Sequence, residues 1–535
     1  MLKNLVDRTV LLINHLPLCP VLKTAALAML AVAVLPASGT STAVGGPAAE
    51  QRPNIVVMLV DDMGFSDLGC YGGEIETPNL DRLAAGGIRF TQFYNTAKCA
   101  QTRATLLSGR YYPEVGLSSL DDCITIAEGL RLGGYATLMT GKWHLGGNPV
   151  ERGWDRYFGH LSGATNYFTG DKSFRLDAEP YDVPQSGFYT TDANVDFAIR
   201  FLEESTRPGR PFFLYIAFNA PHYPLQAPEE DVRKYLGRYK KGWDELREQR
   251  YGRMVEMGII DGRWPLSPRP DDVPAWDSLG EKEKAEHDLT MATFAAMVDR
   301  VDQNVGRLLA KLQAMGALDN TLILFLSDNG ACPFQRTHQK TRDEGLMPWE
   351  PDSYWTYDKQ WAHACNTPFR LYKRNQHEGG IATPLVAHWS KGIKEPGTIT
   401  HEVGHLVDIM PTCLELAGVD YPAAYEGREV GPLRGISLAP IFEGIQRRPH
   451  KELFFLFGNR AHMALRSGQW KLVAHDGGPW EMYDMEADRT ELVDLAAKDP
   501  QRFEAMVRRW EELHEEIVAR PATDRKKQSR KSAKP

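Results

Sequence analysis

Four short, uninterrupted apolar runs, each followed at once by polar side chains, most constrain the fold of this 535-residue chain. Continuous runs of this length and composition suit strands buried on both faces of a mainly parallel sheet. Helical patterns lie between them, and alternating strands and helices indicate a layered α/β architecture. The sequence therefore predicts an α/β fold whose large domain holds a mainly parallel mixed sheet sandwiched by helices. The runs are 54–60, 136–139, 212–218 and 321–326, and the helical patterns include 79–85, 192–204 and 285–315.

The polar clusters that end these runs are expected to meet at one edge of the sheet. In open α/β sheets, ligands bind beyond the carboxyl ends of the strands. Four clusters that are distant in sequence would then converge on one pocket. In chain order the clusters are Asp61-Asp62, Lys142 with His144, His222, and Asp328-Asn329.

Two of these clusters offer oxygen ligands suited to a hard cation. Asp61, Asp62, Asp328 and Asn329 carry carboxylate or amide oxygens, the donors that Ca²⁺ and Mg²⁺ prefer. Taken singly, the same residues also fit structural roles, because an Asp pair can cap a helix and Asn-Gly can form a turn. The expected convergence of the two clusters favours the metal site.

A second, smaller unit is predicted from 448 to 520, after a catalytic domain spanning 50–447. It contains short apolar runs that read as antiparallel strands, followed by a charged helical pattern at 500–517. Two long Trp-containing segments, 228–278 and 331–368, show neither sheet nor helix patterns. We interpret them as loops that shape substrate access, although their aromatics could equally serve to hold the loops in place. The runs in the smaller unit are 452–457, 462–466, 470–473 and 480–483.

The two ends of the chain differ from its body. Residues 1–46 combine basic residues, an apolar stretch and small residues, which predicts a signal peptide and an exported, periplasmic or secreted protein; an uncleaved membrane anchor is the alternative. Residues 521–535 form a basic tail that we expect to be disordered. The net charge is −8 although both ends are basic, so the body is acidic, which argues against a nucleic-acid partner. No later apolar run is long enough to predict a stable membrane span in the mature chain.

The seven cysteines are scattered and show no metal-type spacing, so zinc is not indicated. Cys19 lies in the predicted signal peptide, and disulfide pairing among the other six stays open.

The segment Cys99-Ala100-Gln101-Thr102-Arg103, followed by residues 104–110, resembles the signature of the sulfatase family. Gln101 stands where that signature usually has Pro. We predict a helix over 102–108, with Cys99 just before it. The resemblance extends from about residue 53 to about residue 520, because further family motifs recur in the same order. These are the Asp-Asp pair, Gly-Lys-Trp-His-Leu-Gly at 141–146, Ala-Pro-His at 220–222, Asp-Asn-Gly at 328–330 and the Lys before Glu-Gly-Gly, Lys373.

The resemblance implies a formylglycine-dependent arylsulfatase type within the alkaline phosphatase superfamily. A formylglycine-generating maturation enzyme would oxidise Cys99, and the hydrated formylglycine would be the nucleophile. The implied ligands of a Ca²⁺ or Mg²⁺ ion are Asp61, Asp62, the modified Cys99, Asp328 and Asn329. The implied catalytic residues besides Cys99 are Arg103 beside the nucleophile, Lys142 and Lys373 on the sulfate, His144 on the formylglycine hydroxyl and His222 on the leaving-group side.

We therefore expect a sulfatase that hydrolyses sulfate monoesters, either aryl sulfates or sulfated carbohydrates. Two alternatives remain at this point. One is a phosphonate or phosphate monoester hydrolase of the same superfamily that uses the same nucleophile. The other is an unmatured pseudoenzyme that only binds sulfated ligands. A zinc phosphatase is disfavoured, because Asn329 stands where such enzymes commonly have a His ligand.

Overall fold

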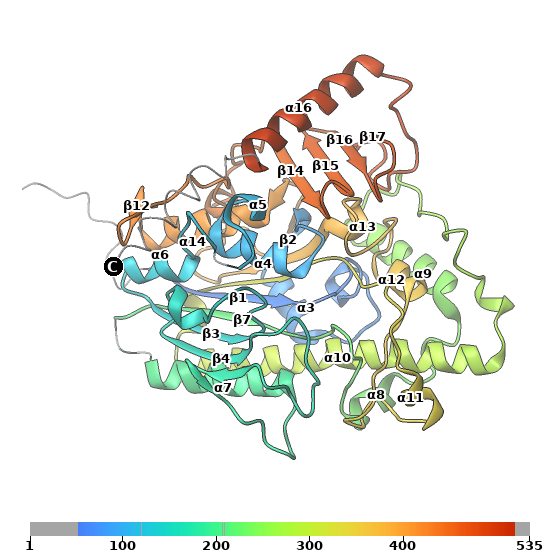
Figure 1. The fold of residues 1–535 in the computed structure, drawn as a ribbon, viewed down its shortest axis with the longest axis horizontal. Helices are drawn as coiled ribbons and strands as arrows, with labels where there is room; N and C mark the ends of the chain where they lie inside the picture. Colours follow the sequence, from blue (N-terminus) through green and yellow to red (C-terminus); the bar gives the residue numbers. More distant parts are fainter. Residues whose placement is uncertain (1–51, 119, 206, 208, 519–535) are drawn as a thin grey trace, which may run out of the picture. The chain divides into compact units, whose positions relative to one another are not determined.

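The computed structural model describes residues 52–518 except 119, 206 and 208. Its main sheet has eleven strands in the order β10-β2-β9-β8-β1-β7-β3-β4-β5-β6, with β11 also paired to β2 (Figure 1). The central strands β8, β1, β7, β3 and β4 are mutually parallel, and β9 runs antiparallel between β8 and β2. This arrangement confirms the predicted mainly parallel mixed sheet. The strands are β1 (Asn54–Val60), β2 (Gly87–Tyr94), β3 (Ala136–Gly141), β4 (Arg156–His160), β5 (Phe174–Leu176), β6 (Glu179–Pro180), β7 (Phe212–Ala217), β8 (Thr321–Ser327), β9 (Ala382–His388), β10 (Thr398–Thr400) and β11 (Gly404–His405).

Alternating side chains of β1 divide the core of the main sheet into two layers. Val56 and Met58 point into one apolar cluster, and Val57 and Leu59 point into the other. Two sets of helices cover the two faces, as Figure 1 shows on either side of the strands. Burial on both faces explains why these strands read as unbroken apolar runs. One set includes α3 (Pro78–Ala85), α7 (Thr190–Ser205) and α10 (Glu281–Ala314), and the other includes α4 (Cys99–Ser108), α5 (Tyr112–Val115), α6 (Ile126–Leu132), α14 (Ile409–Ala417) and α15 (Ala439–Phe442).

The two segments predicted as loops contain helices, so that part of the prediction was wrong. Segment 228–278 holds α8 (Glu229–Tyr235) and α9 (Gly242–Glu256), and segment 331–368 holds α11 (Gln339–Asp343) and α12 (Lys359–Cys365). Helix α9 presents mostly charged residues, which hid its helical pattern. Its buried Trp243 packs against Trp276 and Trp361, with ring centroids 4.9 and 5.4 Å away. These tryptophans hold the two segments together.

A second, antiparallel sheet lies near the C-terminus and joins strands β14 to β17 in sequence order. Helix α16 packs on one of its faces through Trp510, which stacks on Phe454 at 5.4 Å. The opposite face, with Leu453 and Phe455, belongs to the core of the main sheet. The predicted small sheet with its helix is therefore present, while the domain boundaries stay a prediction. The elements are β14 (Glu452–Phe457), β15 (His462–Ser467), β16 (Trp470–Ala474), β17 (Glu481–Asp484) and α16 (Pro500–Val518); α13 (Glu378–Ile381) and the hairpin of β12 (Ala424–Tyr425) with β13 (Arg428–Glu429) complete the α-helices and strands of the described residues.

The predicted signal peptide and basic tail lie outside the described residues. Across the part of the chain that the structure describes, no helix is both long and apolar enough to cross a membrane. The six cysteines in that part are all buried and free, so no disulfide forms among them.

Candidate active site

Two parallel strands bring the acidic clusters together as predicted. Asp61 and Asp62 follow β1, and Asp328 and Asn329 follow its neighbour β8, whose Ser327 is paired with Val60. The backbone N–H of Asp62 donates to Asp328 Oδ1 at 3.4 Å, and Asn329 Nδ2 donates to Asp62 Oδ1 at 2.6 Å. All four side chains are buried at the carboxyl edge of the sheet.

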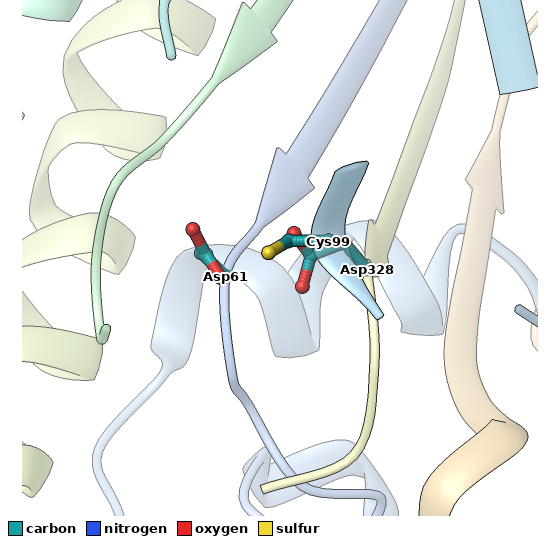
Figure 2. Close-up of side chains that lie close together, drawn as sticks. All are labelled: Asp61, Cys99 and Asp328. Carbon is teal, nitrogen blue, oxygen red and sulfur yellow. The ribbon is translucent and has the colours of Figure 1, made fainter. Parts of the chain in front are cut away.

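Cys99 lies against these carboxylates at the start of α4. The sequence predicted a helix from 102 with Cys99 before it, but the helix begins at Cys99 itself. Thr102 anchors this turn, because its Oγ1 donates to the backbone oxygen of Asp328 at 2.6 Å. The Cys99 sulfur and one carboxylate oxygen each of Asp61 and Asp328 lie within 4.8 Å of one another. Figure 2 shows these three side chains gathered at the ends of their segments.

Three buried cations surround the acidic group. Arg103 Nη2 donates to Asp328 Oδ2 at 3.0 Å and lies 3.6 Å from Asp61 Oδ2. Lys142 Nζ pairs with Asp61, and Lys373 Nζ pairs with Asp62. The predicted cations are thus inside the site rather than on the surface, where lysines usually lie.

The mixture of charges sets the protonation of the site. Burial alone would raise the pKa of Asp61, but Lys142 and the other cations outweigh burial and hold this pKa well below its usual range. Burial and the neighbouring Asp61 carboxylate raise the pKa of Asp328 well above its usual range. Burial would also raise the pKa of the Cys99 thiol, yet Lys142 and Lys373 lower it overall. The cations therefore favour negative charge on residue 99, as they would on a bound anion.

Three buried oxygens in this cluster lack a hydrogen-bond donor. They are Asp61 Oδ1, Asp62 Oδ2 and Asn329 Oδ1. Buried polar atoms without a partner are costly, and a hard cation satisfies such oxygens directly. His222 has a ring nitrogen within 4.8 Å of Asp61 and Asp62 oxygens, so an imidazole is also within reach. The oxygen-rich donor set nevertheless fits Ca²⁺ or Mg²⁺ better than zinc.

The two predicted histidines reach the site from different strand ends. His222 Nδ1 donates to the backbone oxygen of Tyr223 at 2.6 Å, which leaves Nε2 facing Asp62 Oδ2 at 3.6 Å. Burial lowers the pKa of His222 to about 4. Burial and Lys142 lower the pKa of His144 to about 2, and its Nδ1 is buried without a partner. Among the described residues, no hydrogen bond links His144 to Cys99.

Aromatic residues form one wall of the mouth of the site. Tyr354 belongs to a segment that the sequence predicted to shape substrate access, whereas Tyr223 was not assigned to the site. The Tyr223 ring lies 4.1 Å from the His222 ring and 6.2 Å from Tyr354. His338 stacks on Tyr354 at 3.9 Å. Tyr223 and Cys332 line a small cavity together with Asp62. Because Tyr223 directly follows His222 in the sequence, its position could have indicated that it lies beside the site.

Two other histidines, one in the segment 331–368 and one after it, have different surroundings. His363 is buried inside α12, and His377 pairs with Glu481 of β17 at 2.9 Å. A larger cavity of about 750 Å³ lies beside the small sheet, and Gln92 and Arg466 line it. None of the predicted site residues lines that cavity.

Two family models, several relatives and several solved structures match this chain. The family model described as "Sulfatase" matches residues 53–419, and that described as "N-sulphoglucosamine sulphohydrolase, C-terminal" matches residues 369–519. An uncharacterized sulfatase of Schizosaccharomyces pombe is 34% identical over 86% of this chain and 93% of its own length. The arylsulfatase of Klebsiella aerogenes is 32% identical over 76% of this chain and 96% of its own. A solved structure in complex with its substrate, D-glucosamine-2-N,6-O-disulfate, is 25% identical with a TM-score of 0.63, and the match covers 88% of this chain and 99% of that one.

Proposed function

This chain belongs to the sulfatase family, whose members hydrolyse sulfate esters, and on that premise we propose that its nucleophile is a formylglycine derived from Cys99. The observation that carries the proposal is the position of Cys99, at the first turn of α4 and against Asp61, Asp328 and the buried cations. When hydrated, the aldehyde of formylglycine supplies a hydroxyl that can attack sulfur. The buried site offers the charges that such an attack requires.

The cations have the position needed to hold the sulfate. Lys142 pairs with Asp61 and Lys373 pairs with Asp62, so their ammonium groups can bind sulfate oxygens beside residue 99. Arg103 is fixed by Asp328 and by the backbone oxygen of Lys142 at 2.9 Å. We assign Arg103 to orienting the hydroxyls of residue 99.

Asp61, Asp62, Asp328 and Asn329 would hold one Ca²⁺ or Mg²⁺ ion together with residue 99. The unpartnered buried oxygens support this assignment. When bound, the ion would neutralise negative charge on the sulfate and on the nucleophile.

The remaining residues move protons. Asp328, which has a carboxylate oxygen within 4.8 Å of the side chain of residue 99, would take the proton from the attacking hydroxyl. His222 is neutral in the free protein; a bound sulfate would raise its pKa, and the proton that His222 Nε2 then carries would pass to the departing alcohol oxygen. His144, which is neutral at pH 7 because its pKa is lowered, can accept the proton of the second hydroxyl as sulfate leaves.

We propose aryl sulfates or sulfated carbohydrates as substrates. The arylsulfatase relative supports the first class, and the solved structure with a bound disulfated glucosamine supports the second. The comparisons do not favour the phosphonate or phosphate monoester hydrolase. We also propose that the protein is exported, as the N-terminal segment predicts.

The mass of the tryptic peptide that contains residue 99, taken from active protein made in its native host, tests the proposal. The expected peptide has lost sulfur, gained a carbonyl and reacts with hydrazine reagents. Unmodified cysteine in active protein would overturn the formylglycine nucleophile. Unmodified cysteine in inactive protein that still binds sulfate esters would establish the pseudoenzyme instead. Parallel assays on the sulfate and phosphate esters of one alcohol check the reaction class.

A further inference from the structure

Two arginines at the mouth of the active site flank one aromatic ring. The guanidinium carbon of Arg374 lies 4.3 Å from the centroid of the Phe334 ring, and that of Arg336 lies 5.5 Å from it. Among the described residues, neither guanidinium has an ion pair or a side-chain hydrogen bond. Arg374 Nε is also buried without a partner. Both charges therefore lie beside the same ring without a counter-anion from the described residues.

Neighbouring arginines on the same two segments are paired. Arg342 lies 2.7 Å from Glu286, and Arg370 lies 3.6 Å from Glu481. The chain is acidic overall, with a net charge of −8, so carboxylates are abundant. Two nearby unpaired guanidiniums repel each other, and the face of one aromatic ring offsets this repulsion only in part. An anion from outside the chain would offset it more fully.

These arginines are close to the reacting centre. Arg374 directly follows Lys373, and its backbone N–H donates to the backbone oxygen of Ala97 at 2.7 Å, two residues before Cys99. Arg336 lies 5.4 Å from the ring centroid of Tyr223, whose ring contacts His222. The two cations thus reach the mouth from the Lys373 side and from the His222 side. A molecule whose sulfate ester is bound inside would extend between them.

From this geometry we infer that Arg336 and Arg374 bind a second anionic group of the substrate. The inference rests on the proposed sulfatase function and deepens it. The substrate is a sulfate ester that carries another sulfate or a carboxylate, because guanidinium groups bind both through paired N–H···O contacts. Phe334 and Tyr223 supply faces on which the scaffold between the two anions can pack.

The test compares matched ligands that differ in one anion. Hexosamine 6-O-sulfates that carry either an N-sulfo group or a neutral N-acetyl group form one pair, and disulfates with the second group at O3 or O4 extend the set. Uronic acid sulfates and their methyl esters form a second set, which separates a carboxylate from a sulfate. The measured quantity is the ratio of kcat/KM for the doubly anionic ester to that for its singly anionic partner.

In the native protein we expect this ratio to exceed one for at least one doubly anionic ester. Arg336→Gln and Arg374→Gln should each lower the ratio by about tenfold or more, as expected for loss of a charge-assisted hydrogen bond. Arg374→Lys should retain part of the preference for the doubly anionic ester, because lysine keeps the positive charge. Arg428→Gln removes an exposed charge from the β12–β13 hairpin and should leave the ratio unchanged. Thermal unfolding of each variant checks that the fold is intact.

Failure of this inference differs from failure of the proposed function. Hydrolysis of every pair with equal kcat/KM overturns the second-anion site and leaves the sulfatase function standing. Absence of sulfate ester hydrolysis by protein with modified residue 99 overturns the sulfatase function. Titration calorimetry on Cys99→Ala protein then decides the binding question. If the doubly anionic ester binds more tightly than the singly anionic one, and adding Arg374→Gln removes this difference, the result supports the site. Equal binding of both esters overturns it.

Discussion

Lys471 of the small sheet donates from Nζ to Glu378 Oε1 of α13 at 2.8 Å, with both side chains fully buried. Arg489 donates to the other carboxylate oxygen of Glu378, also at 2.8 Å. Glu378 lies five residues after Lys373, so this ion network connects the small sheet to the segment that carries a proposed sulfate ligand. Its energetics can be tested separately from catalysis.

Lys471→Met should destabilise the protein strongly. The change leaves the buried Glu378 carboxylate with one of its cations missing, and removing one member of a buried ion pair costs about 3–5 kcal/mol. The free energy of unfolding, measured in denaturant, checks this value. Lys451→Met, at an exposed position just before β14, is the matched control and should change stability by less than about 0.5 kcal/mol. Equal effects of the two substitutions would contradict the role of the network.

The same network predicts a loss of stability in acid. Burial would raise the pKa of Glu378, but Lys471 and Arg489 outweigh burial and lower its pKa to about 2, from an ordinary value of 4.5. Because the folded pKa is depressed, the stabilisation is complete above about pH 4.5 and is lost as the pH falls towards 2. Glu481 has a similarly lowered pKa, so the wild-type curve contains both groups.

The difference between the stability curves of wild type and Glu378→Gln isolates this contribution. It should be flat above about pH 4.5 and shrink between pH 4.5 and 2. A difference that grows on acidification would show that Glu378 is not stabilised as a carboxylate.

The sequence predicted the central strands well and the mouth of the site poorly, for a physical reason. Central strands such as β1 are buried on both faces, so their apolar run reports their structure directly. The start of α4 was missed by three residues, because Cys99-Ala100-Gln101 carries no capping signal. Phe334 and Arg374 meet only through the packing of two loops, which no local pattern encodes. The pairing of Lys471 with Glu378 depends on tertiary structure in the same way.

Removal of the metal should abolish turnover. The unpartnered oxygens of Asp61, Asp62 and Asn329 predict about one Ca²⁺ or Mg²⁺ per chain by elemental analysis. Asp328→Ala should lose both the ion and activity. Asp319→Ala changes an exposed Asp just before β8 and should retain both. Stoichiometric zinc, or full activity after chelation, would count against the site.

Gln101→Pro should raise the fraction of modified Cys99 in a host with an aerobic maturation enzyme. Position 101 is the third residue of α4, within the first turn, where Pro is tolerated because backbone N–H groups there have no intrahelical acceptor. The buried Oε1 of Gln101 has no partner, so its loss removes no hydrogen bond. Peptide mass spectrometry measures the modified fraction, and an unchanged fraction would show that Gln101 does not limit maturation.

The last prediction concerns which group protonates the leaving alcohol. His222 stands at the mouth of the site, with Nε2 directed to Asp62 and its ring against Tyr223. Burial lowers its pKa to about 4, so the free enzyme holds it neutral at pH 7. Burial would lower the pKa of Lys373, but Asp62 outweighs burial and raises this pKa well above its usual range. Lys373 therefore keeps its proton and is the competing donor.

A series of leaving groups separates the two donors. As the S–O bond breaks, negative charge grows on the departing oxygen; a nitrophenol carries this charge unaided, whereas a sugar alcohol needs a proton. General acid catalysis typically contributes ~10²–10⁴-fold. If His222 is the acid, His222→Ala should cost little kcat/KM on a nitrophenyl sulfate and far more on a sugar sulfate, so kcat/KM should depend more steeply on leaving-group pKa than in wild type. If His222 has a purely structural role, the substitution should lower kcat/KM for both substrates by the same factor. An unchanged dependence would transfer the assignment to Lys373, because the sulfate that Lys373 is proposed to bind also carries the ester oxygen.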